Sequence, residues 1–187
     1  MAQQSINYGT TANDGTGDSL RDAFIKVDEN FDELYADIAT LEAAVIVPYG
    51  GYGMAANATA TTIAVAGTYY KVLGTTTANT LDGFTHSNNR LTYTGTPTHY
   101  FKIVASPISM ISAGTNIRAS LKFAKNGTVI GYPVTRKINT GSDVGACSIS
   151  FDVSLATNDY IELFVTNETN TSSVTVEDLY LGIVHIA

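Results

Sequence analysis

The sequence predicts a mainly β protein in which an N-terminal trimeric coiled-coil helix is followed by a jelly-roll β-sandwich head. Three observations predict this fold. Apolar residues recur at strict heptad spacing near the N-terminus. Beyond about residue 60, apolar and polar residues alternate with a period of two in many short runs. Thr, Gly, Ser, Asn and Tyr are abundant and Trp is absent, which is typical of short strands joined by tight turns.

Residues 1–17 are small, polar and glycine-bearing, so they cannot build a core of their own. We therefore expect this stretch to act as an N-terminal anchor segment that is held by something else.

Residues 18–46 are predicted to form the coiled-coil stem. Asp18 or Ser19 can cap the helix, and Asp22 places a negative charge in the first turn, where the helix dipole favours it. The mean apolar spacing of 3.5 favours helices that wrap around one another, and two phenylalanines in the stripe favour three chains or more. The alternative is one amphipathic helix lying on the β domain. The predicted trimer seam consists of Leu20, Phe24, Val27, Phe31, Leu34, Ile38, Leu41 and Val45.

Residues 47–60, with Pro48 and the run Tyr49–Gly53, are predicted to end the helix and form a glycine-rich hinge. Residues 61–187 are predicted to form the jelly-roll head. Its clearest local signal is Lys125-Asn126-Gly127-Thr128, a hairpin turn of the Asn-Gly kind. Eight or more short strands without a helical pattern between them indicate a sandwich.

The net charge of −7 lies wholly in the N-terminal quarter of the chain. Residues 1–45 contain nine acidic and two basic residues, whereas the remainder contains eight of each. A neutral head without a basic stripe excludes nucleic acid as an expected partner. No run of apolar residues is long enough for membrane insertion, and no signal peptide is recognisable.

The sequence carries no recognisable catalytic or metal-binding motif, so we expect no enzyme, no cofactor and no metal site. Cys147 stands alone in an alternating apolar run, which indicates a small packed side chain rather than a disulfide or zinc ligand. His86, His99 and His185 occur in three separate contexts without ligand spacing.

Three stretches near the N-terminus form one pattern: Ile6–Gly9, Asn13–Arg21 and Asn30–Tyr35. This pattern resembles a motif found at the start of tailed-phage structural proteins, including fibre-carrying baseplate wedge proteins. The resemblance implies a virion component that is docked through its N-terminus. The residues predicted to form this virion anchor are Ile6, Asn7, Tyr8, Gly9, Asp14, Gly15, Gly17 and Asp18.

The head resembles the trimeric jelly roll of tumour necrosis factor (TNF) and the complement globular heads. The run Val153–Leu163 and the last strand around Asp178–Ile183 carry this similarity. The resemblance implies three heads around one axis, which agrees with the coiled coil predicted from the heptads.

Together these features predict a homotrimeric phage virion protein, assembled in the bacterial host cytoplasm and mounted on other virion proteins. A stem of about 40 Å without repeats favours a capsid decoration or head-fibre protein bound to the major capsid protein. The alternative is a tail-fibre or baseplate-associated protein that binds a host surface glycan. In that case Tyr49, Tyr52, Tyr69 and Tyr70, or the loops 82–89 and 167–173, could hold sugars.

Overall fold

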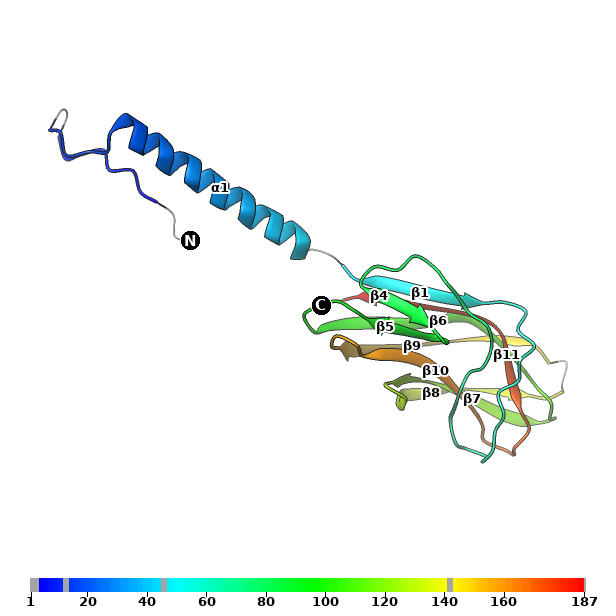
Figure 1. Cartoon of the computed structure of the whole chain (residues 1–187). Helices are drawn as coiled ribbons and strands as arrows, with labels where there is room; N and C mark the ends of the chain where they lie inside the picture. Colours follow the sequence, from blue (N-terminus) through cyan, green and yellow to red (C-terminus); the bar gives the residue numbers. More distant parts are fainter. Residues whose placement is uncertain (1–3, 12–13, 45–46, 141–142, 187) are drawn as a thin grey trace. The chain divides into compact units, whose positions relative to one another are not determined.

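The computed structural model describes residues 4–11, 14–44, 47–140 and 143–186. The chain divides into two compact units, Met1–Ile46 and Val47–Ala187 (Figure 1). The first unit consists of an extended segment and a helix, and the second is a β-sandwich.

Helix α1 (Leu20–Ala44) begins at the position that the sequence predicts. The Ser19 hydroxyl oxygen accepts a hydrogen bond from the Asp22 backbone N–H at 3.1 Å and donates to the Asp22 carboxylate at 2.6 Å. Ser19 is therefore the N-cap, and the Asp22 carboxylate holds the Ser19 hydroxyl in place. Asp18, the other capping candidate, has different partners, described below.

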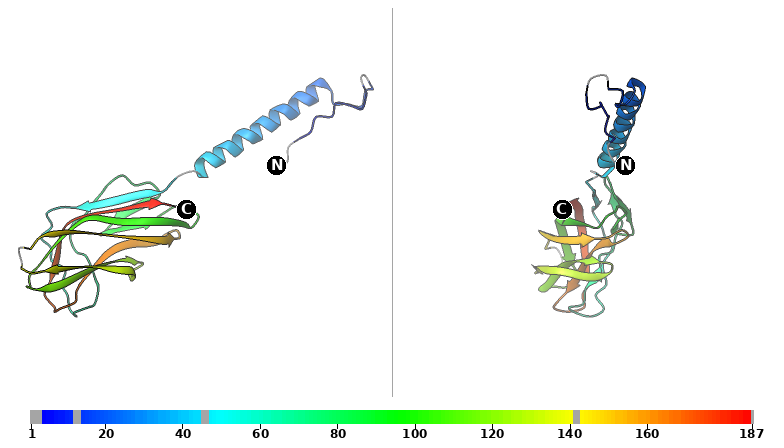
Figure 2. Two further views of the ribbon diagram at one scale, coloured as in Figure 1. Left: turned by 180° about the vertical axis from the view of Figure 1, so that it is seen from behind. Right: turned by 90° about the vertical axis from the view of Figure 1, so that its left-hand side faces the viewer.

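The head contains two antiparallel sheets that pack face to face (Figures 1 and 2). Sheet A has the strand order β3-β1-β11-β6-β9, and sheet B has the order β4-β5-β10-β7-β8, with β2 paired to β10. The strands are β1 (Tyr49–Met54), β2 (Tyr70–Lys71), β3 (Thr77–Ala78), β4 (Phe84–Ser87), β5 (Arg90–Tyr93), β6 (His99–Ser112), β7 (Ile117–Lys125), β8 (Thr128–Ile138), β9 (Gly145–Leu155), β10 (Tyr160–Asn167) and β11 (Val174–His185).

The core lies between the two sheets and is built from alternate residues of their strands. Phe101 and Ile103 of β6 and Leu121 and Phe123 of β7 are fully buried. In β6 the residues next to them are exposed, whereas in β7 Ser120 and Ala124 on the other face are buried as well. Burying one such side chain contributes about 1.5–3 kcal/mol relative to leaving it in water. The period-two alternation in the sequence is thus the cause of the layered fold. The mainly β jelly-roll architecture is confirmed.

The predicted hairpin is also confirmed. β7 and β8 are joined by Asn126 and Gly127, with Lys125 paired to Thr128. Both central residues have positive φ angles, 52° for Asn126 and 77° for Gly127. This is the backbone that a two-residue turn between twisted strands requires.

The glycine-rich run predicted as a hinge is instead a strand. β1 (Tyr49–Met54) lies inside sheet A and pairs with β11 from Tyr49↔Val184 to Met54↔Leu179. Gly50, Tyr52 and Met54 face the core, so the run has the period-two alternation of a strand despite its glycines. Its partner strand lies about 130 residues later, and nothing local in the sequence reveals that pairing.

Candidate functional site

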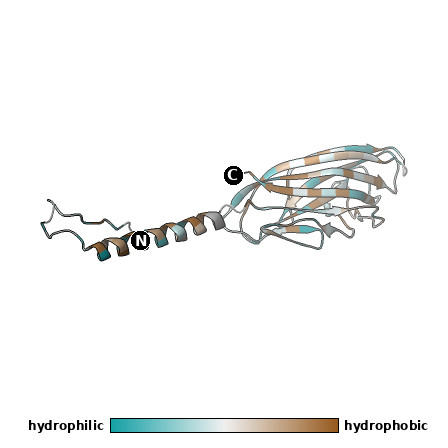
Figure 3. Ribbon diagram, turned by 90° about the horizontal axis from the view of Figure 1, so that it is seen from above, coloured by the Kyte–Doolittle hydropathy of each residue, from teal (hydrophilic) through white to brown (hydrophobic). Residues whose placement is uncertain are grey.

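The predicted trimer seam lies along α1 and is open to solvent. Most of its side chains are 40–76% exposed, with Val27 half-buried. Figure 3 shows hydrophobic residues recurring along the helix between hydrophilic ones. An apolar stripe of this kind on a helix is unfavourable in water unless another surface covers it. The exposed members are Leu20, Phe24, Phe31, Leu34, Ile38 and Leu41. Val45 lies outside the described residues.

The segment before α1 turns back along the helix, and we call its residues 4–18 the N-terminal loop. The backbone N–H of Gln4 donates to the Asn30 side-chain oxygen at 2.9 Å, and the Asn30 amide returns a bond to the Gln4 carbonyl at 3.0 Å. Lys26 Nζ donates to the Ser5 carbonyl at 3.2 Å. These contacts join the N-terminal loop to the first half of the helix.

Two carboxylates organise the N-terminal loop. Asp14 accepts hydrogen bonds of 2.8–2.9 Å from the backbone N–H groups of Thr10, Thr11 and Thr16 and from the Thr10 hydroxyl. The hydrogen bond from the Thr16 backbone contributes most to holding the pKa of Asp14 well below its usual range. Asp18 accepts from Lys26 Nζ at 2.6 Å and from the Asn7 backbone N–H at 2.8 Å, and the lysine hydrogen bond is the main cause of its lowered pKa.

The predicted virion-anchor residues lie close together, and most of them make contacts with other residues of the N-terminal loop. The Asn7 amide donates to the Thr16 carbonyl, and a Cβ on Gly9 or Gly17 would lie only 2.7–3.0 Å from neighbouring atoms. Gly15 has a φ of 69° with open space around it. Ile6 and Tyr8 are the predicted anchor residues with exposed apolar side chains, at 38% and 93% exposure.

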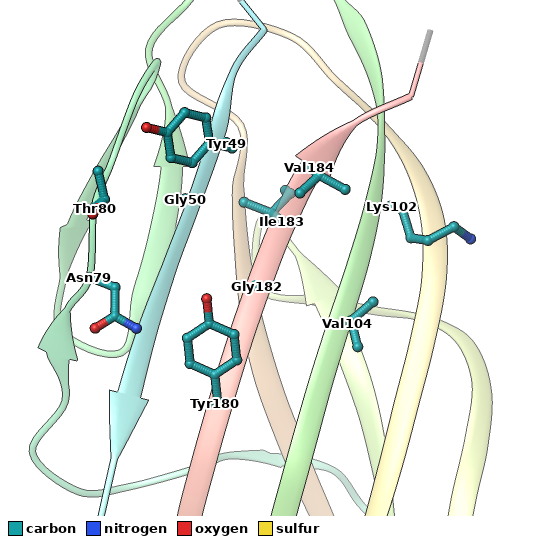
Figure 4. A pocket seen from close by; sticks show the side chains of 10 residues that line it. All are labelled: Tyr49, Gly50, Asn79, Thr80, Lys102, Val104, Tyr180, Gly182, Ile183 and Val184. Carbon is teal, nitrogen blue, oxygen red and sulfur yellow. The ribbon is translucent and has the colours of Figure 1, made fainter.

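The outer face of sheet A carries a shallow groove of about 460 Å³ (Figure 4). The Tyr180 ring lies over the backbone of Gly51, where an added Cβ would meet the Tyr180 hydroxyl oxygen at 2.9 Å. The groove lining is mostly apolar, and Lys102 at its edge pairs with Asp152 at 2.7 Å. It is lined by Tyr49, Gly50, Asn79, Thr80, Lys102, Val104, Tyr180, Gly182, Ile183 and Val184.

Sequence reasoning did not single out this groove. Tyr180 and Val184 stand in a run of β11 that is apolar on both faces, and such a run indicates a strand covered on both sides. The apolar run in the last strand was therefore a signal of a covered outer face, but the same run is also typical of a strand buried inside the core of a single chain.

Two of the three histidines, which lie far apart in the sequence, meet in the fold. Pairing of β6 with β11 brings His99 Nδ1 to 3.0 Å from His185 Nε2, with Phe101 beside both rings. His86 lies apart, bonded to the Thr76 hydroxyl at 2.8 Å, and burial lowers its pKa. Within the described ranges, His, Cys, Asp and Glu side chains nowhere gather in threes that could hold a metal ion.

Cys147 is partly packed, as expected, and burial raises the pKa of its thiol. Across the part of the chain that the structure describes, we find no helix with the length and apolar character to cross a membrane.

The surfaces considered for sugars are only partly available. Tyr52 is 1% exposed, so it cannot serve as a platform. In the loop 167–173, the buried Asn167 bonds through its side chain to Asn170, to the Ser172 carbonyl and to the Thr169 backbone. These amide groups hold the loop in shape and leave little free for a ligand.

Comparisons with known proteins find similarity both in sequence and in fold. A stretch of 36 residues, 19% of this chain, is 56% identical to the baseplate wedge protein gp10 of Enterobacteria phage T4, and it spans 6% of that protein's length. The sandwich is similar to murine APRIL, with a TM-score of 0.50, 10% identity and coverage of 74% of this chain and 99% of that one. PRD1 vertex protein P5 matches equally, with a TM-score of 0.50, 10% identity and coverage of 76% and 99%.

These two structural likenesses show the fold alone, and they agree with the TNF-like jelly roll expected for the head. The family model described as bacteriophage T4 gp9/10-like protein, N-terminal, matches residues 3–176, which is most of the sequence. The chain therefore belongs to the bacteriophage T4 gp9/10-like family of phage structural proteins.

Proposed function

We propose that the protein is a homotrimeric virion component, mounted through its N-terminal segment and presenting a non-catalytic β head. The observation that carries this proposal is the seam of α1. A helix of 25 residues with large apolar side chains 40–76% exposed along one stripe is marginal by itself in water. Three copies wound together would bury the stripe in a shared core.

The head offers a second self-contact, on the outer face of sheet A. Tyr49, Tyr180 and Val184 expose apolar surface there, at 42%, 43% and 49%, and glycine leaves the backbone close to the surface. On the outer side of sheet B, Arg90 and Lys122 carry charge, whereas on sheet A the Lys102–Asp152 pair lies at the edge of the groove. The apolar groove beside this pair suits close approach of another copy, as the TNF-like resemblance implies for three heads around one axis.

For the place in the particle, we favour the tail baseplate. The stretch with 56% identity to a baseplate wedge protein supports this choice, because identity at that level over 36 residues points to a shared attachment. Capsid decoration is the second candidate. It is supported by the length of α1, about 37 Å at 1.5 Å per residue, which is short for a fibre that must search for a receptor.

The proposed role is structural display rather than catalysis. The family model describes bacteriophage T4 gp9/10-like proteins, and the relative with 56% identity over 36 residues is a baseplate wedge protein. Three linked copies also present three N-terminal segments, so weak single contacts with the particle would combine through high local concentration.

Imaging of labelled protein on purified particles tests the proposal. We expect an antibody against the head to mark the baseplate end of the tail. Labelling of the capsid would favour decoration instead, and absence of the protein from purified particles would overturn the proposal.

A further inference from the structure

His99 and His185 lie at the same end of sheet A, His99 as the first residue of β6 and His185 as the last residue of β11. In the register of these two strands His185 pairs with Phe101, so His99 lies diagonally opposite His185. His99 Nδ1 is 3.0 Å from His185 Nε2. Two imidazole nitrogens from separate strands therefore face one another across a single hydrogen bond.

The surrounding contacts hold both rings in place. The backbone N–H of His185 donates to the Pro48 carbonyl at 3.1 Å. The Phe101 ring packs against both histidines, with ring centroids 6.3 Å from His99 and 5.9 Å from His185, and the Tyr93 ring lies 6.3 Å from His99. Side chains that are already positioned lose little conformational freedom when a ligand binds, so the pair is preorganised.

The separation of the two nitrogens suits a shared metal ion. Ligand nitrogens lie about 2.0–2.1 Å from zinc, so two of them in a tetrahedral site are about 3.4 Å apart. His99 Nδ1 and His185 Nε2 would need to separate by only about 0.4 Å to reach this distance. The proton between them would move to the other nitrogen of its own ring, so both rings stay neutral and each offers a lone pair.

The type of ligand indicates the class of ion. Imidazole suits Zn²⁺, Cu²⁺ and Ni²⁺, whereas Ca²⁺ and Mg²⁺ prefer oxygen ligands. Both histidines are half-buried, so water can reach the pair and fill the other coordination positions. The Tyr93 hydroxyl donates to the Pro97 carbonyl at 3.0 Å, so it is already engaged and is not counted as a third ligand.

We propose that His99 and His185 form a two-histidine site for a transition-metal ion of the Zn²⁺ class. The bound ion would join the beginning of β6 to the end of β11 at the centre of sheet A, beside the Pro48 carbonyl where the chain enters the head. No metal site was expected from the sequence, because strand pairing alone brings these histidines together. The site is independent of where the protein is mounted on a particle.

Titration calorimetry of Zn²⁺ into untagged full-length protein at neutral pH tests the site. We expect one ion per chain for the wild type and at least about tenfold weaker binding for His99→Gln and for His185→Gln, because each variant removes one of the two protein ligands. His86→Gln is the matched control and should bind as the wild type does, since His86 lies apart on β4. An excess of Ca²⁺ should not displace the Zn²⁺.

A second measurement uses only the wild-type protein, so it does not depend on the folding of the variants. In NMR spectra of protein with isotope-labelled histidine, Zn²⁺ should shift the ring-nitrogen signals of two of the three histidines and leave the third unchanged. The midpoint of thermal unfolding should also rise with Zn²⁺ concentration, because an ion that binds only the folded state stabilises it.

Several results would overturn the inference. Absence of Zn²⁺ binding to the wild type removes the site, and equal affinity in the wild type, His99→Gln and His185→Gln would mean an adventitious ion only. Displacement of Zn²⁺ by Ca²⁺, or equal NMR shifts of all three histidines, would contradict binding by this pair. These experiments use purified protein, so their failure leaves the proposed function untouched.

Discussion

Each of the two units contains one carboxylate that organises the residues around it, Asp14 in the first unit and Glu162 in the second. Asp14 is half-buried and organises the N-terminal loop by accepting hydrogen bonds from backbone N–H groups. Glu162 is 2% exposed in sheet B and accepts from Lys71 Nζ at 2.7 Å and from Arg90 Nη2 at 3.0 Å. The first shapes a loop, whereas the second satisfies two cations beside a β core.

Order in the N-terminal loop should depend on pH through Asp14. Its pKa is lower in the folded loop than in the unfolded chain, where it is about 3.9. The carboxylate therefore stabilises the loop above that value, and the contribution is lost as pH falls toward the folded pKa. We expect the amide protection factors of Thr10, Thr11 and Thr16, which compare the observed exchange with the intrinsic rate at each pH, to fall as the solution is acidified below about pH 4.

Asp14→Asn is the matching variant, measured by the same amide exchange. It should exchange fast at neutral pH, with little further change in acid. Equal protection in wild type and variant at neutral pH would contradict this role for Asp14.

Glu162→Gln should destabilise the head by about 3 kcal/mol, because it leaves two cations beside a nearly buried site without their counter-charge. Chemical denaturation followed by fluorescence measures the free energy of unfolding. Asp152→Asn is the control. It removes the Lys102–Asp152 pair, whose side chains are 46% and 55% exposed, and exposed pairs contribute less than about 1 kcal/mol. Similar losses for both variants would contradict the account.

At the scale of elements, the helix and the hairpin followed from local sequence. Ser19 and Asp22 mark the start of α1, and the heptad spacing marks its length. Asn126 and Gly127 define the turn between β7 and β8, because both positions require a positive φ angle and few residue types adopt one readily. Each of these signals acts over a few residues.

Long-range pairings could not be predicted in the same way. The glycines of β1 suggest a hinge when only the neighbouring residues are considered. The pairing that makes β1 a strand is with β11, the last strand of the chain, and no local signal indicates it. His99 and His185 meet because β6 and β11 pair, and Gln4 bonds to Asn30 because the loop folds back on α1. Ile63 is buried in the core, although its segment contributes only an isolated bridge from Thr61 to Val174.

The seam prediction belongs to α1. The double substitution Phe31→Ser/Leu34→Ser should abolish association of the stems and reduce the helix signal, because an isolated helix of this length is unstable in water. Circular dichroism at 222 nm and sedimentation of the full-length protein measure the two effects. Ile25→Ser is the control, since Ile25 is 45% exposed but lies outside the heptad stripe. An unchanged double variant would contradict the coiled coil.

For the whole molecule, we propose two self-contacts, one in the stem and one on sheet A of the head. Both involve exposed apolar side chains, those of the α1 stripe and those of Tyr49, Tyr180 and Val184. Assembly and folding would then be coupled, so that oligomer mass and stability depend on protein concentration.

A substitution in the sheet A groove tests the proposed self-contact of the head. Tyr180→Glu should weaken association by about tenfold or more, because it replaces an apolar ring in the groove with a charge that would lie at a shared interface. Tyr132→Glu, on the exposed part of β8, should have no effect. Sedimentation over a range of concentrations measures the change. Equal behaviour of the two variants would exclude the groove as a self-contact.

The most direct test of the central claim is the mass of the purified full-length protein in dilute solution, by light scattering or sedimentation equilibrium. The account predicts a mass near 59 kDa, three times that of the 19.8 kDa chain, persisting at micromolar concentration. A stable, well-folded species of 19.8 kDa under the same conditions would contradict it.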